Sequence, residues 1–142
     1  MRFRHPLCAL LVAVFGLVPA SPGVAHHSVS AVFDEGKQIM LKGTITRIDW
    51  INPHIHMFVD AKDADGKVIT WEIETLPTNW MRKAGITKDA VLSNSATGEV
   101  VTVHANPARD TSKRLGYLQR ITYPAGHFIH VTGDPDSITP KN

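Results

Sequence analysis

Residues 39–51 of this 142-residue chain read IMLKGTITRIDWI, and this stretch decides the fold. Alternate residues of this stretch form two sets that would point to opposite faces of a sheet, and β-branched residues are enriched in it. Both features are typical of a β-strand. Gly43 stands inside the stretch, where a glycine is typical of a bend or a bulge. The sequence therefore predicts a long first strand that bends near its start.

Outward from this stretch, strand patterns and turn signals alternate. Asn52-Pro53 ends the first strand, and the dipeptide Asp65-Gly66 marks a turn between two further strand patterns. A short helical pattern with a glycine stop at Gly85 follows. The predicted elements are strands at residues 54–62 and 67–74, a helix at 77–84, and strands at 99–106, 115–123 and 127–132.

The order of these elements indicates the fold class. Three strands in a meander, one short helix, and two or three further strands are typical of OB-type barrels, in which the helix between the third and fourth strands closes one end. We therefore predict an all-β fold with one short helix, a small OB-like barrel of five to six strands over residues 39–132. A small open sheet with one helix on a face is the alternative. Residues 26–38 are expected to form an N-terminal arm and residues 133–142 a flexible tail.

Residues 1–25 have the pattern of a secretory signal peptide. A basic start precedes an apolar run at residues 7–18, and small-residue cleavage sites follow at Ala20 and Ala25. This apolar run is shorter than the roughly 20 residues that a membrane-spanning helix needs. We expect cleavage after Ala25, export to the periplasm, and no stable membrane anchor afterwards. Cys8 is the single cysteine and leaves with the leader, so the exported chain has no disulfide and no thiolate ligand.

The charge balance argues against one class of partner and singles out histidine. The chain has 15 Lys and Arg against 13 Asp and Glu, and without Arg2 and Arg4 the two signs are equal. A chain without net charge has no general electrostatic reason to bind nucleic acid, so we expect no nucleic-acid partner. Histidine is the abundant chemical group, with eight residues in the chain, seven of them after residue 25.

Several short motifs resemble a known family. They are His26-His27-Ser28 after the leader, Leu41-Lys42-Gly43-Thr44, Trp50 with Asn52-Pro53-His54, Val59-Asp60-Ala61-Lys62-Asp63, and Asp65-Gly66-Lys67-Val68 with Trp71. Together they are similar to a family of exported bacterial proteins classified as a domain of unknown function. The resemblance runs from His26 to about Tyr123. It implies export and a small β-barrel, and it brings no established activity.

The predicted cleavage site gives histidine a particular chemistry. If the leader is cut after Ala25, His26 offers its α-amine and its Nδ1 to one metal ion, and another histidine completes a three-nitrogen site. Copper(II) favours tetragonal nitrogen coordination and leads the divalent affinity order, so copper is the expected cofactor. A cut one residue earlier gives Ala25-His26-His27, whose amine, amides and third-position imidazole also form a square-planar Cu(II) or Ni(II) site.

The further ligand is expected on a strand. His54 and His56 are two apart on a predicted strand, so their side chains share a face. His54 is the preferred partner because Asn52-Pro53 sets it at the mouth of the strand, within reach of an N-terminal arm. The candidate metal ligands are His26, His27, His54 and His56, with His104, His127 and His130 in reserve.

These observations lead to two hypotheses of function. The first is a soluble periplasmic protein that binds copper through its mature N-terminal histidine and a strand histidine, for handling or delivery. The second is a periplasmic interaction or ligand-binding module without metal or catalytic activity, which docks a protein partner or a small ligand. The second hypothesis is favoured by a general tendency: a histidine on a strand more often forms a single hydrogen bond than ligates a metal. The sequence has no oriented nucleophile, phosphate loop or dinucleotide fingerprint, so an enzyme is the weaker expectation.

Overall fold

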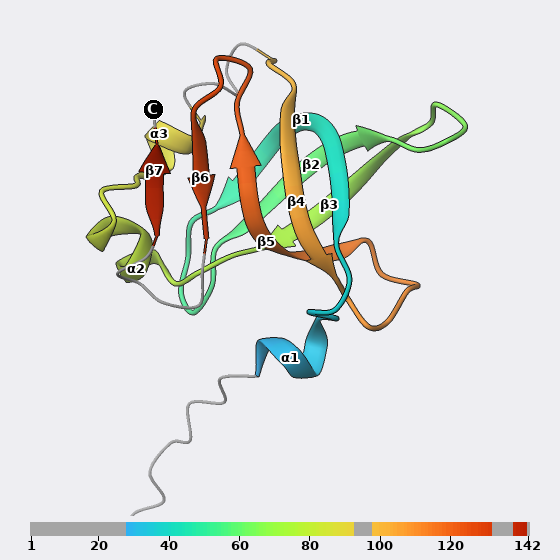
Figure 1. Cartoon of the computed structure of the whole chain (residues 1–142), viewed down its shortest axis with the longest axis horizontal. Coiled ribbons are helices and arrows are strands. Elements are labelled where there is room, and N and C mark those ends of the chain that lie inside the picture. Colours follow the sequence, from blue (N-terminus) through green and yellow to red (C-terminus); the bar gives the residue numbers. More distant parts are fainter. Residues whose placement is uncertain (1–27, 93–97, 132–137, 142) are drawn as a thin grey trace, which may run out of the picture.

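The computed structural model describes residues 28–92, 98–131 and 138–141, and within them one β-sheet curls into a barrel (Figure 1). His26 and His27 lie outside the described residues. The strands are β1 (Ile39–Asp49), β2 (His56–Lys62), β3 (Val68–Glu74), β4 (Val101–Pro107), β5 (Leu115–Thr122), β6 (Phe128–His130) and β7 (Thr139–Lys141).

The barrel closes because β3 and β5 pair in parallel. Antiparallel pairs join β3 to β2, β2 to β1, β1 to β4, and β4 to β5. The parallel pair then aligns Glu72 with Leu115 and Glu74 with Tyr117, which completes a ring of five strands. β6 and β7 extend the sheet beyond β5. This arrangement confirms the predicted OB-like barrel, with the helical segment between its third and fourth strands.

Gly43 allows the first strand to cross closely over its neighbour. A Cβ at this position would lie 2.2 Å from the carbonyl oxygen of Asp60 and 2.8 Å from its carbonyl carbon. The pairing of β1 with β2 then shifts register between Ile45 and Arg47. The predicted bend is therefore built from a position where only glycine fits and an irregularity that follows it.

The helices are short, and one of them was predicted. α2 (Thr78–Lys83) lies within the expected residues 77–84 and is followed by Gly85 at a φ of 74°. α3 (Lys88–Leu92) was not predicted; Thr87 caps it by accepting a hydrogen bond from the Ala90 amide at 3.1 Å. α1 (Val29–Val32) was not predicted either. Helices of four or five residues are too short to show the 3.6-residue periodicity from which a helix is recognised.

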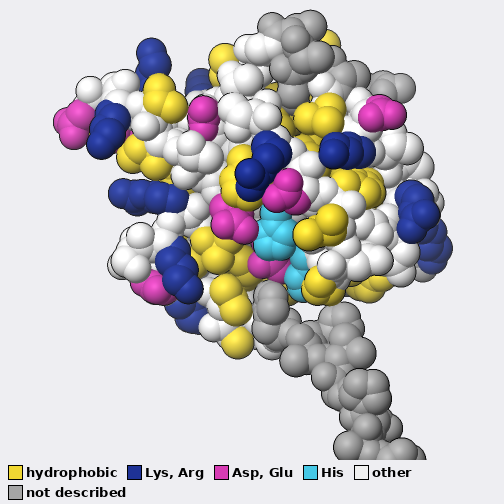
Figure 2. All heavy atoms as spheres, turned by 180° about the vertical axis from the view of Figure 1, so that it is seen from behind, with side chains coloured by type: hydrophobic (Ala, Val, Ile, Leu, Met, Phe, Trp, Pro, Cys, Tyr) yellow, Lys and Arg dark blue, Asp and Glu magenta, His cyan; other side chains and the backbone are white. Residues whose placement is uncertain are grey.

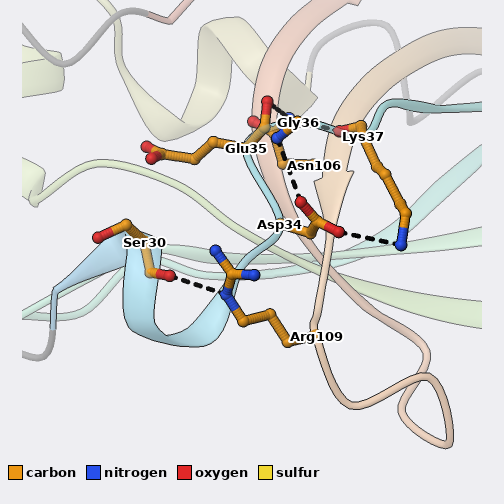
Figure 3. Close-up of polar contacts among 7 residues, drawn as sticks. All are labelled: Ser30, Asp34, Glu35, Gly36, Lys37, Asn106 and Arg109. Atoms are coloured by element: carbon orange, nitrogen blue, oxygen red, sulfur yellow. Dashed lines mark hydrogen bonds and ion pairs between the residues drawn. The ribbon is translucent and has the colours of Figure 1, made fainter.

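The described part of the N-terminal arm, from Ser28 onward, packs against the barrel. Phe33 is fully buried, and its ring centroid lies 5.4 Å from that of Tyr117 on β5. Arg109 donates from Nε to the carbonyl oxygen of Ser30 at 2.9 Å, and Asn106 donates to that of Lys37 at 2.6 Å (Figure 3). These contacts hold α1 at one end of the barrel.

The end of the chain corrects another expectation. Residues 133–142 were predicted as a flexible tail, yet Thr139–Lys141 form β7, which pairs with β6, and Ile138 is buried. The prediction is therefore wrong for residues 138–141, because the free edge of β6 offers backbone partners that a polar composition does not reveal. Within the described residues, no helix is both long and apolar enough to cross a membrane.

The core is mostly aliphatic, with the tryptophans at its margin. Trp50, Trp71 and Trp80 are partly buried and pack against it. The largest of the almost completely buried side chains are Phe33, Ile55, Val59, Ile73, Val101, Val103, Ile121 and Val131.

The structure predicts that Gly43→Ala strongly destabilises the fold. The new Cβ would meet backbone atoms of Asp60, so β1 and β2 must separate, and we expect a loss of roughly 3 kcal/mol in the free energy of unfolding. Urea denaturation monitored by circular dichroism measures it. Gly36→Ala is the matched control, since its nearest contact would be Asp34 Oδ1 at an ordinary 3.4 Å. Equal midpoints for the two variants would contradict the close approach of β1 to β2.

Candidate functional site

His54 and His56 lie on the outer face of the barrel, on the same side of the chain. β2 begins at His56, and His54 precedes it in the segment that follows Pro53. The residues between and after them, Ile55 and Met57, are 1% and 3% exposed and point inward. The alternation that predicted a shared face for the two histidines is therefore confirmed, although the strand starts two residues later than expected.

Each histidine faces a carboxylate of the neighbouring strand. Nδ1 of His54 lies 2.5 Å from Oε1 of Glu74, and Nδ1 of His56 lies 2.8 Å from Oε1 of Glu72. The first pair is the more buried, with side-chain exposures of 13% and 6%. Figure 2 shows histidine side chains beside acidic ones on the face turned away in Figure 1. Two His-Glu pairs thus join β3 to the start of β2 and to the segment before it.

Tyr117 adds a third polar group to the more buried pair. It is aligned with Glu74 across the parallel pairing of β3 and β5, and it is 8% exposed. Burial, followed by the negative charges of Glu74 and Glu35, raises the pKa of Tyr117 to about 12. The phenol is therefore neutral at physiological pH and keeps its proton for hydrogen bonding.

A groove of about 730 Å³ opens beside His54. α2 forms one wall, and a hydrogen bond of 2.7 Å from the Thr78 hydroxyl to Oδ1 of Asn52 ties α2 to the segment before His54. A neighbouring groove of about 540 Å³ shares Val29 and Tyr117 with the first. The lining of the first groove includes Val29, Asn52, His54, Leu76, Trp80 and Tyr117.

The described residues bring together only part of the predicted metal site. His26 and His27 lie outside the described residues, and His56 does not line the groove. In the described part of the chain, no group of three or more His, Cys, Asp or Glu side chains is arranged to hold a metal ion. The reserve histidines lie elsewhere, with His104 on β4, His130 on β6, and His127 stacked on Tyr123 at 4.4 Å.

The site contains two residues that sequence reasoning missed, Glu74 and Tyr117. The signal for Glu74 was present, because Glu72-Ile73-Glu74 repeats on the third strand the alternation of His54-Ile55-His56 on the second. Charged side chains on the outer face of two adjacent antiparallel strands are expected to pair. Tyr117 gave no such signal, since its neighbour depends on the closure of the barrel.

The structure predicts that Glu74→Gln lowers the pKa of Tyr117. The substitution removes one of the negative charges that disfavour the phenolate, while burial remains. Nuclear magnetic resonance of tyrosine labelled at Cζ should show a larger ionised fraction of Tyr117 near pH 11 in the variant. Tyr123, whose pKa is raised to about 12 by burial alone, is the internal control and should not change. Equal ionisation of Tyr117 in both proteins would contradict its proximity to Glu74.

Comparison with known proteins gives a family and no activity. No curated protein and no solved structure matches the chain. A family model described as a family of unknown function (DUF6152) matches residues 16–117, more than two thirds of the chain. The match includes His26, His54, Glu74 and Tyr117 and agrees with the resemblance to a domain of unknown function. The chain therefore belongs to this family of unknown function, DUF6152.

Proposed function

We propose that the protein is exported to the periplasm and binds copper at the groove beside His54, for handling or delivery of the metal. Its mature N-terminus supplies the α-amine and Nδ1 of His26, and His54 supplies the further nitrogen. The observation that carries the proposal is the buried contact between Nδ1 of His54 and Glu74.

The His54–Glu74 pair has the arrangement that supports metal ligation. Metal-binding histidines usually donate their second ring nitrogen to a carboxylate or carbonyl, which fixes the ring and raises its basicity. Because Glu74 engages Nδ1, a metal ion would coordinate His54 through Nε2. The position of His54 in the lining of an open groove is compatible with such a ligand.

The described part of the arm begins beside the groove that His54 lines, two residues after His26 in the sequence. Val29 lines the same groove as His54, and Phe33 and Arg109 hold α1 in place. Three residue steps separate Val29 from His26, and an extended chain covers about 10 Å in that length. Because the arm is anchored at α1, we expect the mature N-terminus to stay near this groove.

The donor set favours copper over other divalent metals. An amine and two imidazoles provide nitrogen ligands in the geometry that Cu(II) prefers. If the leader is cut after Val24 instead, His27 becomes the third residue and replaces His26 as the imidazole donor of the N-terminus. His56, whose Nδ1 faces Glu72 outside the groove, is the less favoured strand ligand.

The groove itself supports a second candidate function. Its volume lies in the range of small-molecule sites, and Val29, Leu76 and Trp80 give it apolar walls. A non-metal interaction or ligand-binding module would use the same surface, with His54 and Asn52 as polar contacts. Such a module becomes the better explanation of the groove if copper affinity proves independent of the N-terminal amine and of His54.

Copper affinity is predicted to depend on the free amine, on His54 and on Glu74. Authentic protein, shown by intact mass to begin at His26, should bind Cu(II) more tightly than a version with one extra Met at its N-terminus. His54→Ala should weaken binding at least as much as Glu74→Gln, for which we expect a loss of about 10–100-fold. Calorimetry gives the affinities, and electron paramagnetic resonance counts the nitrogen ligands. His104→Ala is the control and should bind like the parent.

The pH dependence of binding has a defined sign. An α-amine and an imidazole have ordinary pKa values of about 7.7–8.0 and about 6.5, and copper needs both groups deprotonated. Affinity should therefore fall as the pH falls through this range. If the authentic, extended and His54→Ala forms bind copper equally, the proposed site is wrong.

A further inference from the structure

A second pocket lies at the end of the barrel, between the N-terminal arm and the loop that joins β4 to β5. Its volume is about 190 Å³, the share of about six water molecules in the liquid. Basic side chains dominate its lining, because Lys37 comes from the arm and Arg109, Lys113 and Arg114 come from the loop. Such a local excess stands out in a chain whose charges balance once Arg2 and Arg4 are set aside.

Internal partners compensate these cations only in part. Lys37 lies 3.0 Å from Asp34, and Lys113 lies 3.9 Å from Asp110. Arg109 donates from Nε to the carbonyl oxygen of Ser30, a neutral acceptor, as Figure 3 shows. In the described part of the chain, neither Arg109 nor Arg114 forms an ion pair. Two guanidinium groups of the described residues therefore lie at this pocket without a carboxylate at ion-pair distance.

The positive charges of the pocket act on Asp34, the carboxylate in its lining. Figure 3 shows Asp34 between Lys37 and Arg109. The hydrogen bond from Lys37, with the positive charges of Lys37 and Arg109, holds the pKa of Asp34 below its ordinary value. Asp34 is one carboxylate against four cations in the lining. The pocket thus keeps an excess of positive charge after its own acid is counted.

Trp71 gives the pocket an apolar wall. β3 begins at Val68, but its pairing with β5 starts only at Glu72, so Trp71 precedes the point of barrel closure and is partly buried. The guanidinium carbon of Arg114 lies 5.6 Å from the centroid of its ring. This distance is within the range of a cation–π contact, which holds the arginine over the pocket without neutralising it.

From this arrangement we infer that the pocket binds a small organic anion that carries two or more carboxylate or phosphate groups. Guanidinium groups match the planar oxygens of such anions in bidentate hydrogen bonds. Two arginines on one loop favour a ligand with more than one charged group, and the volume limits it to a small molecule. The lining of this pocket shares no residue with the groove beside His54, so the site is independent of copper binding.

The test uses citrate and inorganic phosphate as probes on the protein from residue 26 onward. Calorimetry at low ionic strength should give a dissociation constant for citrate of ~1 mM or less, and added salt should weaken it. Arg109→Gln and Arg114→Gln should each weaken citrate binding by about tenfold or more, since each removes charged hydrogen bonds. Weaker binding of phosphate than of citrate would support a requirement for several charged groups in one organic ligand, and equal affinity would overturn it.

Controls separate a built pocket from general surface charge. Arg82→Gln removes an exposed arginine of α2, outside the pocket, and should change citrate affinity less than about twofold. Because Arg109 also anchors α1, Lys113→Gln tests the pocket without disturbing that contact. Chemical shift changes on adding citrate should cluster at Trp71 and residues 107–114. The inference is overturned if citrate does not bind at ~10 mM, or if Arg82→Gln weakens binding as much as Arg114→Gln.

Discussion

The parallel pairing of β3 with β5 is the constraint on which the rest of the structure depends. It closes the barrel, and it pins β3 between β2 on one side and β5 on the other. The same register aligns Glu74 with Tyr117 while the outer face of β3 presents Glu74 to His54. The His-carboxylate-phenol cluster is therefore completed by barrel closure, since the β3–β5 pairing brings Tyr117 beside Glu74, which already faces His54 in the segment before β2.

Closure also creates the binding surface for the N-terminal arm. Phe33 packs on Tyr117, the residue of β5 that lies opposite Glu74. A fully buried aromatic side chain contributes roughly 1.5–3 kcal/mol by leaving water, so this contact is a large part of what holds a four-residue helix to the barrel. As a result Val29 lines both grooves that meet at Tyr117. The start of the described chain is brought to His54 by core packing.

Local patterns were sufficient to predict the barrel and insufficient to predict its site. The alternation at residues 39–51, the helix at 77–84 and Gly43 each report a short-range preference, and the structure agrees with all three. The sequence did not predict α1, α3 and β7, because elements of so few residues show no measurable periodicity and depend on tertiary contacts. The contact region of Glu74 and Tyr117 was not predicted for a different reason. The two residues are 43 positions apart in the sequence, far outside any local window, and their proximity follows from a long-range parallel strand pair.

Energetics separate the His54–Glu74 pair from the other histidine contacts of the protein. Removing a carboxylate from water costs several kcal/mol even after relaxation, and an apolar pair of similar size would avoid that cost. Glu74 is 4% exposed, whereas His56 meets a Glu72 whose side chain is 44% exposed and remains hydrated. Stability alone thus gives no reason for a buried carboxylate at Glu74, since the neighbouring Ile73 already supplies the side chain that β3 buries in the core. Departures from the rules of strand burial concentrate at functional sites. The burial of Glu74 therefore supports the proposed role of the His54–Glu74 pair, whereas the exposed pair is explained by the ordinary pairing of neighbouring strands.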